Sequence, residues 1–285
     1  MTQNDVGLIG KVAIVTGCGR LQGIGRAVAL DLARAGADVA VTDLVLEGTR
    51  NVADASEAEV AAGWRGLPSL VEEVQAMGRR AVALTGDISC EADVERVFAG
   101  AVAALGQVDI VVNNAGAPHG ADRGVSWEIP IEAYDRVMHI NARGVFMMSR
   151  AAIRHMLARL DAGEEIAGRI INVASGAGKR GVPERAAYCA SKFAVIGLTQ
   201  TLAQELGGRD ITVNAVCPGQ IATARGASRE RRRAEAGVQF EFIKAAVSRQ
   251  GTGHDIARAV TFLAEPGASF ITGQSIMVDG GMLMP

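Results

Sequence analysis

Tyr188 and Lys192 are the two side chains whose types and spacing most directly suggest chemistry. They lie four residues apart in a segment of helical period, so both project from one face of the expected helix. A phenol has a reference pKa of about 10. A neighbouring ammonium favours the phenolate, which moves that pKa toward the working range of a general acid and base. Tyr-x-x-x-Lys pairs also occur by chance on exposed helix faces, so a third group must decide between the two interpretations.

Ser175 is that third group. It follows the run Arg169–Val173, which is rich in β-branched residues and which we predict to be a buried strand. A hydroxyl at the end of a strand can hydrogen-bond a substrate oxygen on which negative charge develops. The three residues together predict proton transfer to or from a substrate oxygen.

A glycine-rich turn leads from the first predicted strand into a helix, with the sequence Thr-Gly-Cys-Gly-Arg-Leu-Gln-Gly-Ile-Gly over residues 16–25. Glycines there permit a tight turn and let the backbone approach a pyrophosphate. The charge of such a group is stabilised by N–H groups and by the positive end of the helix. Glycine-rich turns are common, so independent support has to come from the end of the next strand.

Asp43 ends that next strand, eighteen residues after Gly25. An acid at about this spacing can accept hydrogen bonds from both hydroxyls of an adenosine ribose. It would also repel a 2′-phosphate, because two unit charges ~4 Å apart at an effective dielectric of ~20 repel by about 4 kcal/mol. The pattern favours NAD over NADP. Two alternatives stay open: Asp43 as an ordinary turn residue, and Arg20 as a partial compensation for a 2′-phosphate.

The elements that position these residues alternate along the chain. Short β-branched runs predict strands at Val12–Thr16, Asp38–Thr42, Ala81–Thr85, Val108–Val112, Arg169–Val173, Thr212–Val216 and Ser275–Val278. Segments of helical period lie between them, at Gly25–Ala35, Ser69–Met77, Ala92–Ala104, Ile131–Leu160, Tyr188–Leu206 and His254–Leu263. Strands that are apolar on both faces and separated by helices indicate a buried parallel sheet. We therefore predict an α/β protein, a single-domain doubly wound Rossmann fold with a seven-stranded parallel sheet over residues 1–285.

Two stretches look like additions to that sheet. Residues 44–67 form a long insertion after the second strand, which we interpret as a surface excursion in preference to a lid or a subunit contact. Residues 220–251 follow the sixth strand and are a candidate substrate lid. Apolar residues at 240, 242 and 243 favour an apolar pocket, whereas the arginines of residues 229–233 would suit an anionic substrate if they faced inward.

Composition argues against several classes of protein. The chain has 285 residues, 49% of them hydrophobic, and a formal charge of −2, so nothing indicates a nucleic acid or an acidic membrane as partner. We see no signal sequence and no apolar run long enough to cross a bilayer, and we expect a cytoplasmic protein with a small-molecule partner. No metal is expected, because no ligand spacing relates the cysteines and histidines: Cys18, Cys90, Cys189, Cys217, His119, His139, His155 and His254.

Over nearly its whole length, from Lys11 to about Met282, the chain resembles the short-chain dehydrogenases/reductases, in the group with chains of about this length. The motifs that carry the resemblance occur in this order: Gly23-Ile24-Gly25, Asp87, Asn113-Asn114-Ala115-Gly116, Asn141 in Asn-Ala-Arg-Gly, Ser175, Tyr188-Cys-Ala-Ser-Lys192, Pro218-Gly219-x-Ile221-x-Thr223 and Asp279-Gly280-Gly281. One departure is the glycine turn, where five residues, 18–22, stand in place of the usual three.

The resemblance implies roles for four residues. Tyr188 would be the general acid and base, and Lys192 would lower its pKa and hold the nicotinamide ribose. Ser175 would orient the substrate oxygen, and Asn141 would hold a water that continues the proton relay. An Asn in the middle of a helix is ordinarily expected to face solvent, so the role of Asn141 depends on the resemblance alone.

The resemblance also implies a set of cofactor-binding positions. Besides Tyr188 and Lys192, they comprise Gly17, Gly23, Ile24, Gly25, Asp43, Asp87, Ile88, Asn113, Ala115, Gly116, Pro218, Gly219, Ile221 and Thr223. The expected activity is an NAD-dependent interconversion of a secondary alcohol and a ketone. The alternatives are an NADP-dependent 3-oxoacyl reductase-like enzyme and a nucleotide-sensing or scaffold protein without turnover. The family resemblance further implies a homotetramer or homodimer.

Overall fold

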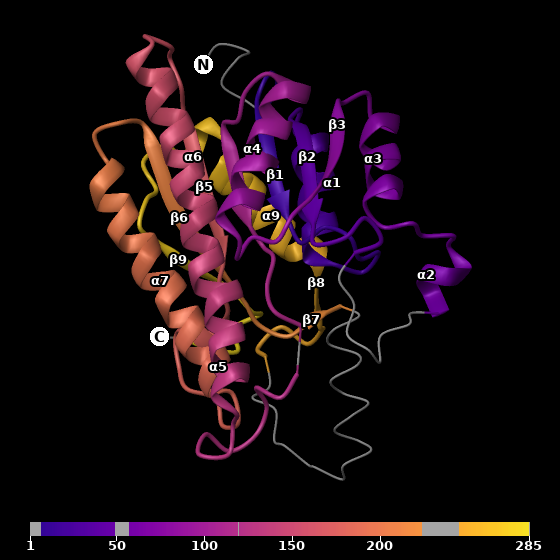
Figure 1. Cartoon of the computed structure of the whole chain (residues 1–285), viewed down its shortest axis with the longest axis vertical. Helices are drawn as coiled ribbons and strands as arrows, with labels where there is room; N and C mark the ends of the chain where they lie inside the picture. Colours follow the sequence, from indigo (N-terminus) through magenta and orange to yellow (C-terminus); the bar gives the residue numbers. More distant parts are fainter. Residues whose placement is uncertain (1–6, 49–56, 119, 224–244, 285) are drawn as a thin grey trace.

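The structure is a computed structural model that describes residues 7–48, 57–118, 120–223 and 245–284. Seven strands form one parallel sheet in the order β3-β2-β1-β4-β5-β6-β9 (Figure 1). Their bounds are β1 Val12–Thr16, β2 Asp38–Asp43, β3 Ala81–Thr85, β4 Ile110–Asn113, β5 Gly168–Val173, β6 Ile211–Pro218 and β9 Ser275–Val278. The predicted seven-stranded parallel sheet is confirmed.

Helices cover both faces of the sheet, and alternate strand residues supply the two cores. Val15 of β1 packs with α1 Ile24–Arg34, α3 Leu67–Ala76 and α9 Gly253–Ala264. Its neighbour Ile14 packs on the opposite side with α4 Glu91–Leu105, α6 Gly144–Asp161 and α7 Ala186–Leu206. In Figure 1, α6 and α7 run side by side in front of the sheet while α9 lies behind it. Burial on both faces explains why the strands read as continuous apolar runs.

Strand order reverses at β1, which lies between β2 and β4. In an open α/β sheet, a crevice forms outside the carboxyl ends of the strands at such a switch point. The glycine turn follows β1, Asp43 ends β2, and the Asn-Asn-Ala-Gly motif begins at the end of β4. The topology therefore brings three separate motifs to one edge of the sheet.

The long helix predicted over Ile131–Leu160 is interrupted. The structure has α5 Ile131–Met138, a π-helical turn η2 His139–Arg143, and then α6. The backbone N–H of Gly144 donates to the carbonyl of His139, five residues back. A π-helical turn of this kind is common at functional sites because it redirects the side chains within it. Asn141 lies within this turn and is buried, with 1% of the residue exposed, so the ordinary expectation of a solvent-facing Asn is wrong.

The methionines on this long helix belong to the core. Met147, Met148 and Met156 are buried in the cluster between α4, α6 and the sheet, and Phe146 is the exposed member of the group. Met147, Met148 and Met156 therefore serve ordinary core packing.

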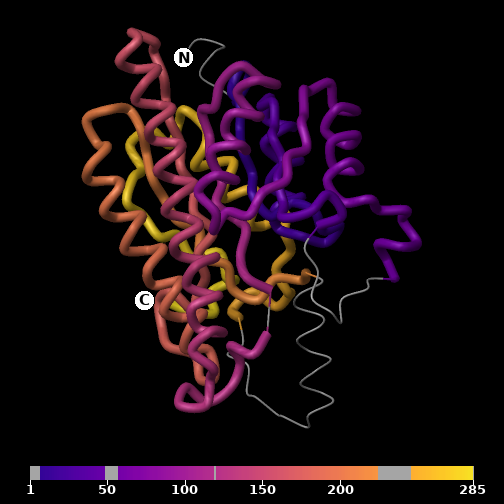
Figure 2. Tube along the Cα trace, viewed as in Figure 1, coloured from indigo at the N-terminus to yellow at the C-terminus, as the bar shows by residue number. Residues whose placement is uncertain are grey.

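Three short elements, α2 Glu57–Ala61, β7 Ile221–Ala222 and β8 Gly251–Thr252, lie outside the seven-stranded sheet. Helix α2 precedes α3, and the trace in Figure 2 shows it at the edge of the molecule beyond β2 and β3. The two-residue strands β7 and β8 pair in parallel, which joins the two ends of the candidate lid. Residues 224–244, which include the Arg run and the apolar positions 240, 242 and 243, lie outside the described residues.

No helix within the described ranges combines the length and the apolar character needed to cross a membrane.

His155 on α6 gives the fold a testable pH dependence. Its Nε2 accepts a hydrogen bond of 3.1 Å from the backbone N–H of Val108. Burial, and to a smaller degree the charge of Arg159, lowers the pKa of His155 below its usual value. The unfolded chain therefore takes up this proton at a higher pH than the folded chain does, so stability is lost as the pH falls below about 6.5.

We expect the free energy of unfolding, measured by urea titration, to fall between about pH 7.5 and pH 5.5. The contribution of His155 should be about 1 kcal/mol, the net value of one hydrogen bond. The variant His155→Gln cannot take up a proton at this position and should lose less stability over the same range. An equal loss in the wild-type protein and the variant would contradict this role of His155.

Candidate active site

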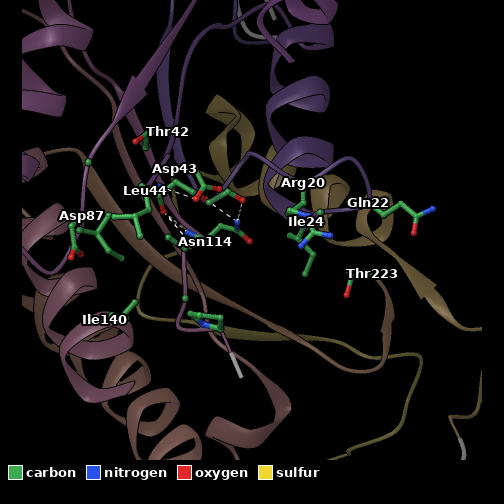
Figure 3. A pocket seen from close by; sticks show the side chains of 18 residues that line it. Arg20, Gln22, Ile24, Thr42, Asp43, Leu44, Asp87, Asn114, Ile140 and Thr223 are labelled. Carbon is green, nitrogen blue, oxygen red and sulfur yellow. Dashed lines mark hydrogen bonds between the residues drawn. The ribbon is translucent and has the colours of Figure 1, made fainter. Parts of the chain in front are cut away.

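A cavity at the switch point is bounded by the glycine turn on one side and by the ends of β2, β3 and β4 on the others (Figure 3). Its lining residues are Thr16, Gly17, Arg20, Gln22, Gly23, Ile24, Thr42, Asp43, Leu44, Gly86, Asp87, Ile88, Asn114, Ala115, Gly116, Pro118, Ile140 and Thr223. Most of the residues that we predict to bind the adenosine half of the cofactor therefore line one cavity. Gly25 is the exception in the glycine motif, because it packs behind the turn and does not line the cavity. A Cβ added to Gly25 would lie only 2.3 Å from the carbonyl oxygen of Gly17.

Glycine is required at position 17 for two reasons. Its φ of +73° is rarely adopted by residues with a Cβ. A Cβ on Gly17 would also lie 2.8 Å from the Cα of Ala115. The backbone of the turn and the backbone of the segment after β4 are therefore in direct contact at this position.

Helix α1 presents its N-terminus beside this cavity. Its N-cap is Gly23, which has no side chain to cap the helix, and the first turn of the helix carries no acidic residue. The first N–H groups of a helix have no partner within the helix. Together with the positive end of the helix dipole, they form a site suited to an anion such as a pyrophosphate.

Asp43 is held in place by the backbone around it. Its two carboxylate oxygens accept hydrogen bonds from the N–H of Gly19 at 2.9 Å and from the N–H of Leu44 at 2.8 Å. The residue is buried and lines the cavity. The bond to Gly19 ties the end of β2 to the glycine turn, so the strand-end acid and the turn form one unit.

Cys18 fills the space under the lengthened turn. It is fully buried, and its thiol donates to the carbonyl of Val15. Burial raises the pKa of Cys18 well above its usual value, and the charge of Asp43 raises it further. The thiol therefore stays protonated and serves packing.

Asn113 and Asn114 are adjacent but face opposite ways. The amide of Asn113 donates to Ser149 at 3.0 Å and to Asn172 at 2.8 Å, inside the core. The structure does not bring the Asn113 side chain to the cavity, because β4 continues through this residue and directs it toward α6. Asn114 lines the cavity instead, and its amide donates to the carbonyls of Thr16 and Gly17. The Asn-Asn pair in the sequence could have identified this position, but not which of the two Asn residues faces the cavity.

A second cavity continues from the first, since Ile24, Asn114, Gly116 and Thr223 line both. It contains all four of the predicted reacting residues and the predicted residues after β6. The full lining is Ile24, Asn114, Gly116, Asn141, Val173, Ala174, Ser175, Tyr188, Lys192, Pro218, Gly219, Gln220, Ile221 and Thr223.

Ser175 begins a short 3-10 turn, η3 Gly176–Gly178. Its hydroxyl oxygen accepts a hydrogen bond of 3.1 Å from the N–H of Ala177. This fixes the oxygen while the hydroxyl proton stays available to a substrate oxygen, because a hydroxyl can accept and donate at once.

Tyr188 and Lys192 share one face of α7, as their spacing predicts. The ammonium nitrogen of Lys192 lies 5.8 Å from the centre of the Tyr188 ring. Lys192 is buried, and its ammonium donates to the carbonyl of Val173 at 2.8 Å. That bond places the Lys192 ammonium at the end of β5, two residues before Ser175 in the sequence.

The Asn141 side chain links two parts of the site. Its oxygen accepts from the N–H of Ala117 at 2.8 Å, and its amide donates to the hydroxyl of Ser191 at 3.1 Å. Ser191 in turn donates to the backbone carbonyl of Tyr188 at 2.8 Å. Asn141 therefore connects the segment after β4 to the helix that carries Tyr188.

Arg123 is a site residue that sequence analysis missed. Its guanidinium lies 5.2 Å from the centre of the Tyr188 ring. It comes from the connection between β4 and α5, where the buried Asp122 pairs with both Arg123 and Arg136. Nothing in the local pattern of this connection signals that it reaches Tyr188, more than sixty residues later in the chain.

The two cavities fit a nicotinamide dinucleotide. The N-terminus of α1 suits a pyrophosphate, and the carboxylate of Asp43 lines the cavity, where it could accept from ribose hydroxyls. The continuation of the cavity leads to Tyr188 and Lys192. Within the described residues, no group of three or more His, Cys, Asp and Glu side chains could hold a metal ion.

Comparison with known proteins agrees with this arrangement. Residues 17–283 match the family described as Enoyl-(Acyl carrier protein) reductase. A short-chain dehydrogenase/reductase from Hericium erinaceus is 40% identical over 275 residues, which cover 95% of this chain and 97% of that protein. A 3-oxoacyl-[acyl-carrier-protein] reductase from Synechocystis sp. is 36% identical, with 97% and 98% covered.

A solved structure is similar to this chain over almost its whole length. The crystal structure of a dehydrogenase/reductase from Sinorhizobium meliloti superposes with a TM-score of 0.78 at 35% identity, covering 98% of both chains. Fold, site and similarity agree over almost the entire chain. The protein therefore belongs to the short-chain dehydrogenase/reductase family and is an oxidoreductase that acts on CH–OH groups.

Proposed function

We propose that this protein is an NAD-dependent oxidoreductase that interconverts a secondary alcohol and a ketone, with Tyr188 as the general acid and base. The observation that carries the proposal is that Ser175, Tyr188, Lys192 and Asn141 line one cavity, which continues into the cavity of the glycine turn and Asp43. A nicotinamide bound there would accept a hydride from the alcohol carbon or return it to the ketone.

The residues of this chain would handle the proton. In the oxidising direction Tyr188 takes the proton from the substrate hydroxyl, and in the reducing direction it gives the proton back. The ammonium of Lys192 stabilises the phenolate form of Tyr188 electrostatically, because it lies on the same helix face. Ser175 donates a hydrogen bond to the substrate oxygen as negative charge develops on it.

Asn141 supports this arrangement through the hydrogen bonds of its amide, and the relay water proposed for it stays a prediction. The residues Pro218, Gly219, Ile221 and Thr223 line the second cavity and are proposed to contact the nicotinamide. Asp87 and Ile88 line the first cavity and are proposed to flank the adenine. The homotetramer or homodimer and the cytoplasmic location stay predictions from the sequence.

The choice of NAD rests on Asp43. Its carboxylate lines the cavity where an adenosine ribose would lie, and its charge would repel a 2′-phosphate. The second candidate is reduction of a 3-oxoacyl thioester, favoured by the similarity to the 3-oxoacyl-[acyl-carrier-protein] reductase from Synechocystis sp..

A panel of substrates tests the proposal. Secondary alcohols are offered with NAD and with NADP, and ketones and 3-oxoacyl thioesters with NADH and with NADPH, while absorbance follows the reduced cofactor. We expect turnover of at least one alcohol–ketone pair, with NAD preferred. Binding of NADH without turnover of any member would favour a sensing protein, and a preference for NADPH with 3-oxoacyl thioesters would favour the second candidate.

A further inference from the structure

The lengthened glycine turn and the insertion after β2 pack against each other. Oε1 of Glu59, on α2, accepts from Nε of Arg20 at 2.8 Å and from the N–H of Leu21 at 3.1 Å. The indole N–H of Trp64 donates to the carbonyl of Gly19 at 2.8 Å. Each of these contacts joins a residue of the insertion to a residue of the turn. In its described part, the insertion is therefore more than the surface excursion expected from sequence.

The contact between Glu59 and Arg20 is shielded from solvent. The exposed fraction of the side chain is 2% for Glu59 and 14% for Arg20. Charges that are removed from water interact more strongly than surface charges do, and each needs its partner to offset the cost of desolvation. The Glu59 carboxylate is thus expected to hold the Arg20 guanidinium firmly.

Arg20 lies where its charge bears on the choice of cofactor. It lines the same cavity as Asp43 (Figure 3). The N–H of its neighbour Gly19 donates to the Asp43 carboxylate. A guanidinium is a strong, bidentate partner for a phosphate group. An arginine at this place, without a carboxylate to hold it, would attract the 2′-phosphate that Asp43 repels.

We propose that Glu59 is a positioning residue for cofactor specificity. By holding Arg20, it keeps the guanidinium from pairing with a 2′-phosphate, so that the cavity selects a dinucleotide with a 2′-hydroxyl. Asp43 acts by direct repulsion, whereas Glu59 acts by removing an attraction. The inference rests on the proposed function, since it presumes that this cavity holds the adenosine ribose of the cofactor.

The neighbouring pair of Arg26 and Glu73 offers a matched control. Nε of Arg26 donates to Glu73 at 2.8 Å, and the Arg26 guanidinium lies 5.3 Å from the centre of the Trp64 ring. This pair also joins α1 to the segment after β2, but neither of its residues lines the cavity. Glu73→Gln therefore removes the same charge from the same region, from a pair that does not line the cavity.

The experiment measures the dissociation constants of NADH and NADPH by fluorescence titration of the full-length protein. Glu59→Gln keeps the shape of the side chain and an oxygen that can accept from Leu21, but it loses the carboxylate charge that pairs with Arg20. We expect NADPH to bind about tenfold more tightly to this variant, because a charge-assisted contact to the phosphate becomes possible. NADH binding should change by less than about twofold, and Glu73→Gln should leave the ratio of the two constants unchanged.

A second variant keeps the test decisive if Glu59→Gln does not fold. In the presence of Glu59, Arg20→Gln should leave the ratio of NADPH to NADH affinity within about twofold of wild type, because the held guanidinium contributes little to phosphate binding. A selective loss of NADPH binding in Arg20→Gln would overturn the inference. So would equal tightening of both cofactors in Glu59→Gln, since Arg20 would then serve the pyrophosphate.

These outcomes separate the inference from the proposed function. If the wild-type protein binds neither NADH nor NADPH, the proposed function fails. If wild-type protein binds NADH but Glu59→Gln keeps the wild-type ratio, the role of Glu59 is wrong and the proposed function stands.

Discussion

Tyr188→Phe is expected to reduce kcat by about 10³-fold or more, because the phenol hydroxyl is the only part of the side chain that the change removes and general acid–base catalysis typically contributes 10²–10⁴-fold. The ring that packs beside Lys192 and Arg123 is kept. NADH binding should therefore stay within about threefold of wild type. Steady-state kinetics with an active alcohol–ketone pair, together with NADH titration, measures both quantities.

The chain carries its own control for this experiment. Its only other tyrosine is Tyr134 on α5, which packs against the small cluster around Ala117, Val137 and Ala187 and lines neither cavity. Tyr134→Phe should keep kcat within about twofold, because the hydroxyl that it removes belongs to a residue that lines neither cavity. If Tyr188→Phe also kept its activity, the assignment of the proton donor would be wrong.

The second large effect is expected at Asp43. Asp43→Ala should raise the use of NADP relative to NAD, but it also removes the hydrogen bonds from Gly19 and Leu44 that hold the turn. Asp43→Asn is the sharper change, because its amide oxygen can still accept one of these bonds while the charge is lost. A repulsion of about 4 kcal/mol sets an upper limit of roughly 10³-fold. We expect the ratio of kcat/KM for NADP to that for NAD to rise by about tenfold or more.

Asp87→Asn is the matched control for the loss of charge. Asp87 lines the same cavity, and its carboxylate accepts from the backbone and hydroxyl of Ser89. Since it is proposed to lie beside the adenine and not the ribose, its neutralisation should leave the NADP-to-NAD ratio within about twofold. An unchanged ratio in Asp43→Asn, or an equal rise in both variants, would reject repulsion at Asp43 as the cause of specificity.

Asp43 and Glu59 both contact the glycine turn, but only one of these two acids can be recognised from the sequence. Asp43 follows a β-branched run and a glycine turn at a regular spacing, so its place was evident from the sequence. Glu59 sits in a stretch without periodicity, and its partner Arg20 is 39 residues away. A contact of that kind depends on how the intervening chain folds back over the turn.

Local pattern also failed where the backbone departs from regular geometry. A polar Asn in the middle of a helix is ordinarily expected to face solvent, but Asn141 lies in the π-helical turn His139–Arg143, is buried and lines the second cavity. The adjacent Asn113 and Asn114 are equally polar, and only the point at which β4 ends decides which one enters the core.

The sequence by itself determined the alternation of strands and helices, the parallel sheet, the glycine turn and the shared face of Tyr188 and Lys192. The strands and the sheet follow from continuous β-branched apolar runs that alternate with segments of 3.6-residue period, and the shared face of Tyr188 and Lys192 follows from that same helical period. The glycine turn follows from its residue types and its place between a strand and a helix. Tertiary structure alone decided that Arg123 reaches Tyr188 and that α2 brings Glu59 to Arg20. Such contacts are made by aperiodic connections, whose paths depend on packing and charge pairing across distant parts of the chain and leave no repeating pattern to read.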